Sequence, residues 1–260
     1  MKPSFVHLRV SSEYSISRGL LRINEIIDRA VKLKMPAVAL TDLNNMFGMV
    51  KFFKKAESAG IKPIAGTILN LNSEDGFEGE ILCLAKNNAG LKTLMGLIST
   101  AQLQQKNGKI TLSFEELLGC AGNVIIIAGG SNSHIFQLSK HHKLAELEQE
   151  LKKFQRAFGE DFCIELQKVG KEHEEEFIQT ILPLASALNI PVLATNDAMF
   201  LQQEDFDIHE TKVCINTGKT LNDPNRQKLY TSEQFYKSST EMTNLFEEYG
   251  ADTLVSNTFH

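Results

Sequence analysis

The sequence lacks the cysteine pattern of a disulfide-stabilised protein. It has four cysteines in 260 residues, they lie far apart, and no two are spaced as CxxC. Three of them lie in or beside apolar runs, which is typical of buried thiols in a reducing compartment. This pattern disfavours a disulfide framework. The cysteines are Cys83, Cys120, Cys163 and Cys214.

Long apolar runs are also missing. No run approaches the 18 or so residues that are needed to cross a bilayer. The first four residues lead directly into an apolar strand pattern and do not resemble a signal peptide. We therefore expect a cytoplasmic protein without a membrane partner.

Positive charge is not in excess. The formal net charge is -5 and the sequence pI is about 5.8. A stand-alone nucleic-acid-binding domain usually carries a basic face, so this balance argues against that class. Contacts with DNA through other parts of a longer protein are still compatible with it.

Short apolar strands alternate with amphipathic helices along most of the chain. The most apolar strand pattern covers residues 124–128, where Ile125, Ile126 and Ile127 follow one another. Apolar runs of this kind are typical of parallel strands that are covered on both faces. From residue 203 onward the chain becomes polar and helical. The predicted strands are residues 5–10, 37–40, 63–71, 80–85, 124–128, 162–166 and 191–195, and the helices between them begin near residues 23, 46, 89, 144 and 172.

This order predicts five to seven β/α units in one α/β domain that covers residues 1–260. A closed or distorted barrel fits the length better than an open sheet does, although periodicity leaves both possible.

Ser113 and Glu116 are spaced as a capping box and predict the start of a helix.

Several segments resemble the amino-terminal PHP (polymerase and histidinol phosphatase) domain of bacterial DNA polymerase III alpha subunits. The resemblance continues through Asp205 and His209 to Glu241 and Phe246, and so covers nearly the whole chain. Its order and spacing are more specific than any single motif. The matching segments are residues 5–15, 39–48, 59–66, 84–87 and 194–197.

The resemblance implies a distorted (β/α)7 TIM-like barrel and a place in the bacterial chromosomal replicase. It implies as partners the rest of the polymerase alpha subunit, a proofreading exonuclease subunit and, through the full-length replicase, DNA. The full-length parent would be a DNA-directed DNA polymerase that uses Mg²⁺, with its palm, thumb and fingers outside these 260 residues. For this chain the resemblance implies a non-catalytic scaffold that supports the polymerase and docks the exonuclease.

Intact PHP domains resemble metallophosphoesterases, which bind up to three divalent ions at the carboxyl ends of the barrel strands. In this sequence the matching positions hold few metal ligands, and only Asp197 keeps the residue type of the family. The nine vestigial positions are Arg9, Ser11, Arg18, Leu43, Ile68, Glu80, Gly130, Asp197 and Met199.

Donor chemistry makes a metal centre at these positions unfavourable. Leucine, isoleucine and glycine side chains have no lone pair to donate, and arginine remains protonated. We therefore expect no metal and no catalytic residue in this chain. We also predict that Arg9 forms an ion pair with Asp197, with one contact or in bidentate geometry, in place of a lost cation.

Two other functions are left open. The chain could be an active metal-dependent PHP phosphoesterase, either histidinol-phosphatase-like or a proofreading nuclease, although the lost ligands oppose this. It could also be an unrelated α/β-barrel enzyme in which Asp42, Asp197 and Glu80 form acid/base pairs.

Two smaller motifs favour structural roles. His209, with Asp205 and Asp207 nearby, is better explained by a polar helix start than by a metal site. The segment 129–131, Gly-Gly-Ser, lacks the full spacing of a phosphate-binding loop and is better explained as a tight turn.

Overall fold

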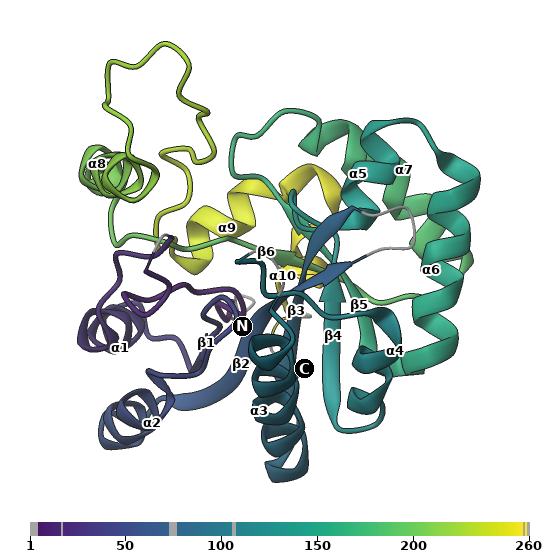
Figure 1. Ribbon diagram of the computed structural model, residues 1–260, viewed down its shortest axis with the longest axis horizontal. Helices are drawn as coiled ribbons and strands as arrows, with labels where there is room; N and C mark the ends of the chain where they lie inside the picture. The colour runs from purple at the N-terminus through teal and green to yellow at the C-terminus, as the bar shows by residue number, and fades with distance from the viewer. Residues whose placement is uncertain (1–4, 17, 73–76, 106–107, 257, 259–260) are drawn as a thin grey trace.

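The computed structural model describes residues 5–16, 18–72, 77–105, 108–256 and 258. Its strands form one mixed sheet in which spatial order follows chain order. Helices surround the outside of this sheet (Figure 1). The strands are β1 (Ala37–Leu40), β2 (Lys62–Asn72), β3 (Glu78–Ala85), β4 (Val124–Ala128), β5 (Phe162–Gln167) and β6 (Val192–Thr195).

The amino-terminal segment closes the sheet into a distorted barrel. On one side, the N–H groups of Ala39 and Thr41 donate to the carbonyls of His7 and Val10, at 2.8 and 3.0 Å. On the other side, Val10 forms a parallel bridge with Ala198, just beyond β6. The predicted strand at residues 5–10 therefore occupies the seventh strand position, although only Val10 has regular bridge geometry.

One expectation for the strands was wrong: β3 runs antiparallel to both of its neighbours, β2 and β4. The cause is the length of the connection. Only five residues separate the end of β2 at Asn72 from the start of β3 at Glu78. A parallel crossover needs a dozen or more residues, so these strands can only form a hairpin.

The barrel interior has its own apolar cluster, which contains strand and amino-terminal residues but no helical residue. Ile68, Leu82 and Ile127 lie side by side across three strands. A second, larger cluster joins the outer faces of the strands to the helices. The interior cluster comprises Val6, Leu8, Ala37, Ala39, Ile68, Leu82, Leu84, Ile127 and Leu193.

Most of the predicted helices are present within a few residues of their expected bounds. The capping box is present, since the Ser113 hydroxyl accepts from the N–H of Glu116 and the Glu116 carboxylate accepts from the N–H of Ser113. The longer helices are α1 (Ile23–Lys32), α2 (Met49–Ser58), α3 (Asn88–Leu103), α6 (Leu144–Phe158), α7 (Glu174–Ala187) and α8 (Phe206–Thr217). The shorter ones are α4 (Phe114–Leu117), α5 (His134–Lys140), α9 (Ser239–Leu245) and α10 (Ala251–Ser256).

Helix α8 and the loop after it extend to one side of the barrel (Figure 1). Throughout the described part of the chain, every helix is too short or too polar to cross a bilayer.

Candidate functional site

A layer of charged side chains lies above the apolar interior, at the end of the barrel where the parallel strands finish. Glu165 lies near the end of β5, and Asp197 lies two residues beyond β6. Because β3 is antiparallel, its early residue Glu80 lies at this same end, paired in register with Asn70 of β2. Arg9, on the closing segment, meets all three carboxylates.

Arg9 uses three of its nitrogens on three different acids. Its Nη1 lies 2.9 Å from Glu165 Oε1, and its Nε lies 3.1 Å from Asp197 Oδ1. Its Nη2 pairs with Glu80 Oε2. The Arg9 side chain is only 3% exposed, so these contacts are shielded from water.

Arg18 binds two of the same acids from the loop that follows the closing segment. Its Nη1 lies 2.6 Å from Glu80 Oε1. Its Nη2 donates to both oxygens of Asp197, at 2.9 and 2.8 Å. Asp197 is therefore contacted by both arginines, and the Arg9–Asp197 pair is a single contact rather than a bidentate one.

Neutral donors complete the coordination of the carboxylates. The Gln234 amide donates to Asp197 Oδ2 at 2.9 Å. The Thr195 hydroxyl donates to Glu165 Oε2 at 2.6 Å, and the Asn132 amide donates to Glu80 Oε1 at 3.0 Å. Each acid thus accepts hydrogen bonds on both oxygens, which is the arrangement that stabilises an ionised carboxylate.

Burial and the arginines act in opposite directions on the pKa values of these acids. Burial alone raises the pKa of Asp197, but Arg18 and Arg9 outweigh it and lower that pKa to about 2. The same balance lowers the pKa of Glu80. At Glu165 the effect of burial is larger than the opposing effect of Arg9, so the pKa of Glu165 is raised. The carboxylates in turn outweigh burial at both arginines and raise their pKa values.

The residues present do not fit the divalent ions that the resemblance to PHP domains implies. The carboxylate oxygens that a metal would need already accept hydrogen bonds from guanidinium groups and neutral side chains. Throughout the described residues, no group of three His, Cys, Asp or Glu side chains has a metal-binding arrangement. A cation entering this layer would also meet two fixed positive charges at contact distance.

The other positions that the sequence predicted as vestigial surround the charged layer or lie below it. Met199 is buried beside Gln234, whose amide approaches its sulfur at 3.7 Å. Ser11 is buried, and its hydroxyl has no partner among the described residues. Leu43 and Ile68 form a bridge to each other and pack in the apolar interior cluster.

Gly130 leaves room for Glu165. A Cβ atom added at Gly130 would lie 2.7 Å from Glu165 Oε1, well inside van der Waals contact. The position that the resemblance assigns to a metal ligand therefore accommodates the third carboxylate in this chain. The nearby segment 129–131 forms a turn, as the sequence predicted. The N–H of Ser131 in this turn faces Gln167 Oε1 at 3.4 Å.

Glu165 was not among the predicted site residues, although the sequence pattern contains a signal for it. Glu165 is buried between Ile164 and Leu166, in a strand in which only Cys163 is half-buried. A single acid in such a strand requires a partner, because an isolated buried charge is strongly unfavourable. Gln167 and Gln234 were also missed, and neither has a comparable signal in the sequence.

Asp42 and His209 have positioning roles rather than a place in the charged layer. Asp42 accepts from the N–H and hydroxyl of Ser12, both at 2.7 Å, and from the hydroxyl of Ser15 at 2.6 Å. The imidazole of His209 donates to the carbonyl of Arg18 at 2.6 Å. These contacts fix the loop that carries Arg18.

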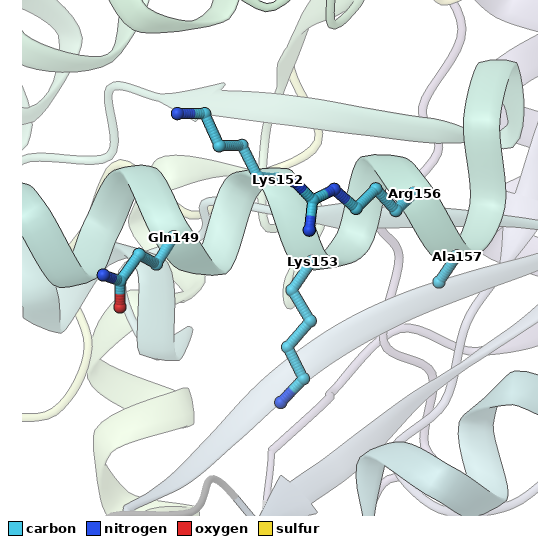
Figure 2. Close-up of a pocket in the computed structure, with 5 residues that line it drawn as sticks. All are labelled: Gln149, Lys152, Lys153, Arg156 and Ala157. Atoms are coloured by element: carbon cyan, nitrogen blue, oxygen red, sulfur yellow. The ribbon is translucent and has the colours of Figure 1, made fainter.

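A separate hollow of about 470 Å³ lies along α6 and not at the charged layer. Its lining residues belong to that one helix, and Lys152 and Lys153 point to opposite sides of it (Figure 2). Without converging side chains, this surface has no geometry suited to chemistry.

Comparison with known proteins identifies the family. The family model of the PHP domain matches residues 7–169. The chain is 39% identical to the DNA polymerase III subunit alpha of Pseudomonas aeruginosa over 251 residues, which is 95% of this chain and 21% of the relative. It is 35% identical to the subunit of the same name from Vibrio cholerae over 250 residues, again 95% of this chain and 22% of the relative. The chain thus spans about a fifth of the length of these relatives.

Solved structures agree at the level of fold. A putative metal-dependent phosphoesterase from Bifidobacterium adolescentis gives a TM-score of 0.53 at 11% identity, over 74% of this chain and 86% of that one. An amidohydrolase from Chromobacterium violaceum gives a TM-score of 0.51 at 17% identity, over 75% and 88%. Together with the match over residues 7–169, these likenesses lead to one conclusion: the chain belongs to the PHP domain family.

Proposed function

We propose that this chain is the PHP domain of a bacterial DNA polymerase III alpha subunit and that it acts there as a non-catalytic scaffold. The identity of 32–39% to proteins of that name over almost the whole chain supports the assignment. In this proposal the polymerase chemistry and its Mg²⁺ belong to the rest of the alpha subunit. DNA is then contacted through the full-length replicase in the cytoplasm.

The observation that carries the scaffold role is the occupation of the barrel mouth by two arginines. Each of Glu80 and Asp197 pairs with both guanidinium groups, and Glu165 pairs with Arg9. The layer joins the closing segment, the β2–β3 hairpin, β5 and the loop after β6. Its role in the proposal is to hold these four parts of the barrel together.

A phosphatase assay separates the scaffold from an active phosphoesterase. The purified chain is treated with chelator, supplied in turn with Mn²⁺, Zn²⁺ or Mg²⁺, and tested on p-nitrophenyl phosphate. The scaffold proposal predicts background rates with every metal. Metal-dependent turnover that is abolished by chelator and by Asp197→Ala would instead establish the phosphoesterase.

The proposal includes docking of the proofreading exonuclease subunit. Mixing this chain with the exonuclease subunit and measuring co-elution by size-exclusion chromatography tests it. Co-elution that withstands 0.5 M salt is the expected result. Separate elution at micromolar concentrations of both proteins would remove the docking role from this domain.

A further inference from the structure

Lys171 lies at the barrel mouth, but neither the scaffold nor any metal site accounts for it. It lies in the loop between β5 and α7, and its Nζ donates to the hydroxyl of Ser131 in the loop after β4, at 2.8 Å. Within the part of the chain that the structure describes, no carboxylate oxygen lies within ion-pair distance of this Nζ. The acids of the charged layer pair with Arg9 and Arg18 instead.

The backbone of Lys171 is fixed by α7. The Glu174 carboxylate accepts from three consecutive backbone N–H groups, those of Val169, Gly170 and Lys171, at 2.9, 3.0 and 3.1 Å. Glu174 is itself buried. The backbone position of Lys171 is therefore fixed. Its side chain is partly buried and reaches Ser131 in the loop after β4.

Several charged groups lie near Lys171, and its protonated amine adds a positive charge among them. Glu80, Glu165 and Asp197 contribute three negative charges, and Arg9 and Arg18 contribute two positive ones. Lys171 supplies a third positive charge at this end of the barrel. Any reaction that makes this amine permanently neutral leaves the carboxylates of the mouth with one positive charge fewer to compensate them.

The surroundings of Lys171 also favour the unprotonated, nucleophilic form of its amine. Burial lowers the pKa of Lys171. Asp197 and Glu80 act against this change, whereas Arg18 and Arg9 act with it. Glu174 faces the same loop from α7. Among the described residues the single polar partner of the Nζ is a neutral hydroxyl, and no carboxylate of this part of the chain lies at contact distance to hold the proton in place.

We propose that Lys171 is a modification site for activated acyl compounds, such as acyl phosphates and acyl thioesters, and that its acylation switches the charge of the barrel mouth. In the reaction, the lone pair of Nζ forms an amide bond to the acyl carbon. The bond from that carbon to the leaving phosphate or thiolate breaks, and the leaving group takes the electron pair. The proton lost from the amine goes to water. This inference stands apart from the scaffold proposal, since it needs only the geometry around Lys171.

Other lysines provide the comparison. Lys54 and Lys62 are exposed and serve as the reference lysines. Lys237 also has a pKa lowered by burial, but its side chain is only 3% exposed and pairs with Glu233. Lys171 is partly accessible and has no acidic partner among the described residues.

Competitive labelling with trace acetic anhydride tests the proposal on the unmodified chain. Labelling is carried out from pH 6 to pH 10, and the acetylated peptides that contain residues 54, 62 and 171 are quantified by mass spectrometry. We expect Lys171 to reach half of its maximal rate at a lower pH than Lys54 and Lys62. A profile that coincides with theirs, or no label at Lys171 while they react, would overturn the proposal.

The consequence of acylation is tested with Lys171→Gln, which mimics the neutral amide, and Lys171→Arg, which keeps the charge. Lys171→Gln is expected to lower the thermal midpoint, and to lower it more in 20 mM than in 500 mM salt, because screening weakens the effect of the lost positive charge. Lys171→Arg is expected to keep the wild-type salt dependence. Equal salt dependence of all three proteins would contradict the charge switch.

Discussion

At the scale of single residues, the charged layer depends on the shape of the guanidinium group. A guanidinium carries five N–H donors in a fixed plane, so one Arg9 side chain can meet three acids and Arg18 can meet both oxygens of Asp197. A lysine in the place of Arg9 would provide one nitrogen instead of three. Because the layer is buried, loss of one partner leaves the others as unpaired charges.

Asp197→Asn tests this dependence. Asp197 pairs with both arginines, and removal of one partner from a buried ion pair typically costs about 3–5 kcal/mol. We expect a loss of this order in the free energy of unfolding at pH 7, measured with urea. Asp28→Asn, which removes an exposed partner of Lys55, is the control and should have little effect. Similar small effects of both substitutions would contradict the account.

Asp197 also makes the free energy of unfolding depend on pH in the acidic range. The pKa of Asp197 in the folded chain, about 2, lies below its ordinary value of 3.8. Its contribution is therefore complete above about pH 4 and is lost as the pH falls toward 2, which amounts to about 2 kcal/mol. The difference in unfolding free energy between wild type and Asp197→Asn should shrink across this range. A constant difference from pH 5 to pH 2 would contradict the assignment.

Gly130→Ala tests the space that Glu165 requires. The new Cβ would lie 2.7 Å from Glu165 Oε1, and overpacking of this kind typically costs about 1–3 kcal/mol. Gly96→Ala in α3 is a matched control, because an added Cβ there meets nothing within 4 Å. In a helix interior that change should stabilise the chain slightly. Equal effects at the two glycines, measured with urea, would exclude a steric role for Gly130.

At the scale of elements, closure of the barrel depends on the amino-terminal segment. His7 attaches this segment to the later part of the chain, since its imidazole donates to the carbonyl of Lys237 at 2.8 Å. Its ring also packs against Phe5 and Tyr236. Burial lowers the pKa of His7 from 6.5 to about 3, so the folded chain holds this imidazole neutral.

This predicts a pH dependence for barrel closure. Because the unfolded chain binds a proton at His7 below about pH 6.5 and the folded chain does not, acidification favours unfolding. Wild type should lose about 2 kcal/mol from this group between pH 7 and pH 5. His7→Asn should flatten that slope, whereas His142→Asn, at an exposed side chain, should leave it unchanged. An unaltered slope in His7→Asn would show that another group governs this range.

At the scale of the whole molecule, local sequence patterns predicted where the strands and helices lie. They predicted less well how these elements are arranged. Apolar runs located the strands, and the spacing of Ser113 and Glu116 located a helix start. The alternation of strands and helices predicted a series of β/α units and so did not predict the antiparallel β3, although the short connection from β2 forbids a crossover. Pairing within the site was harder still. Arg9 and Asp197 lie 188 residues apart in the chain, and only a family resemblance placed them together.

Arg9 and Arg18 occupy the charged layer, and we propose that they stand where a metal-binding PHP domain would hold divalent cations. A titration of the chelator-treated chain with Mn²⁺, followed by electron paramagnetic resonance, measures this most directly, because bound Mn²⁺ loses its sharp free-ion signal. The account predicts a free-ion signal that rises in proportion to added Mn²⁺, with well under one ion bound per chain at 100 µM. Two or three bound ions per chain, released by Asp197→Asn, would contradict it.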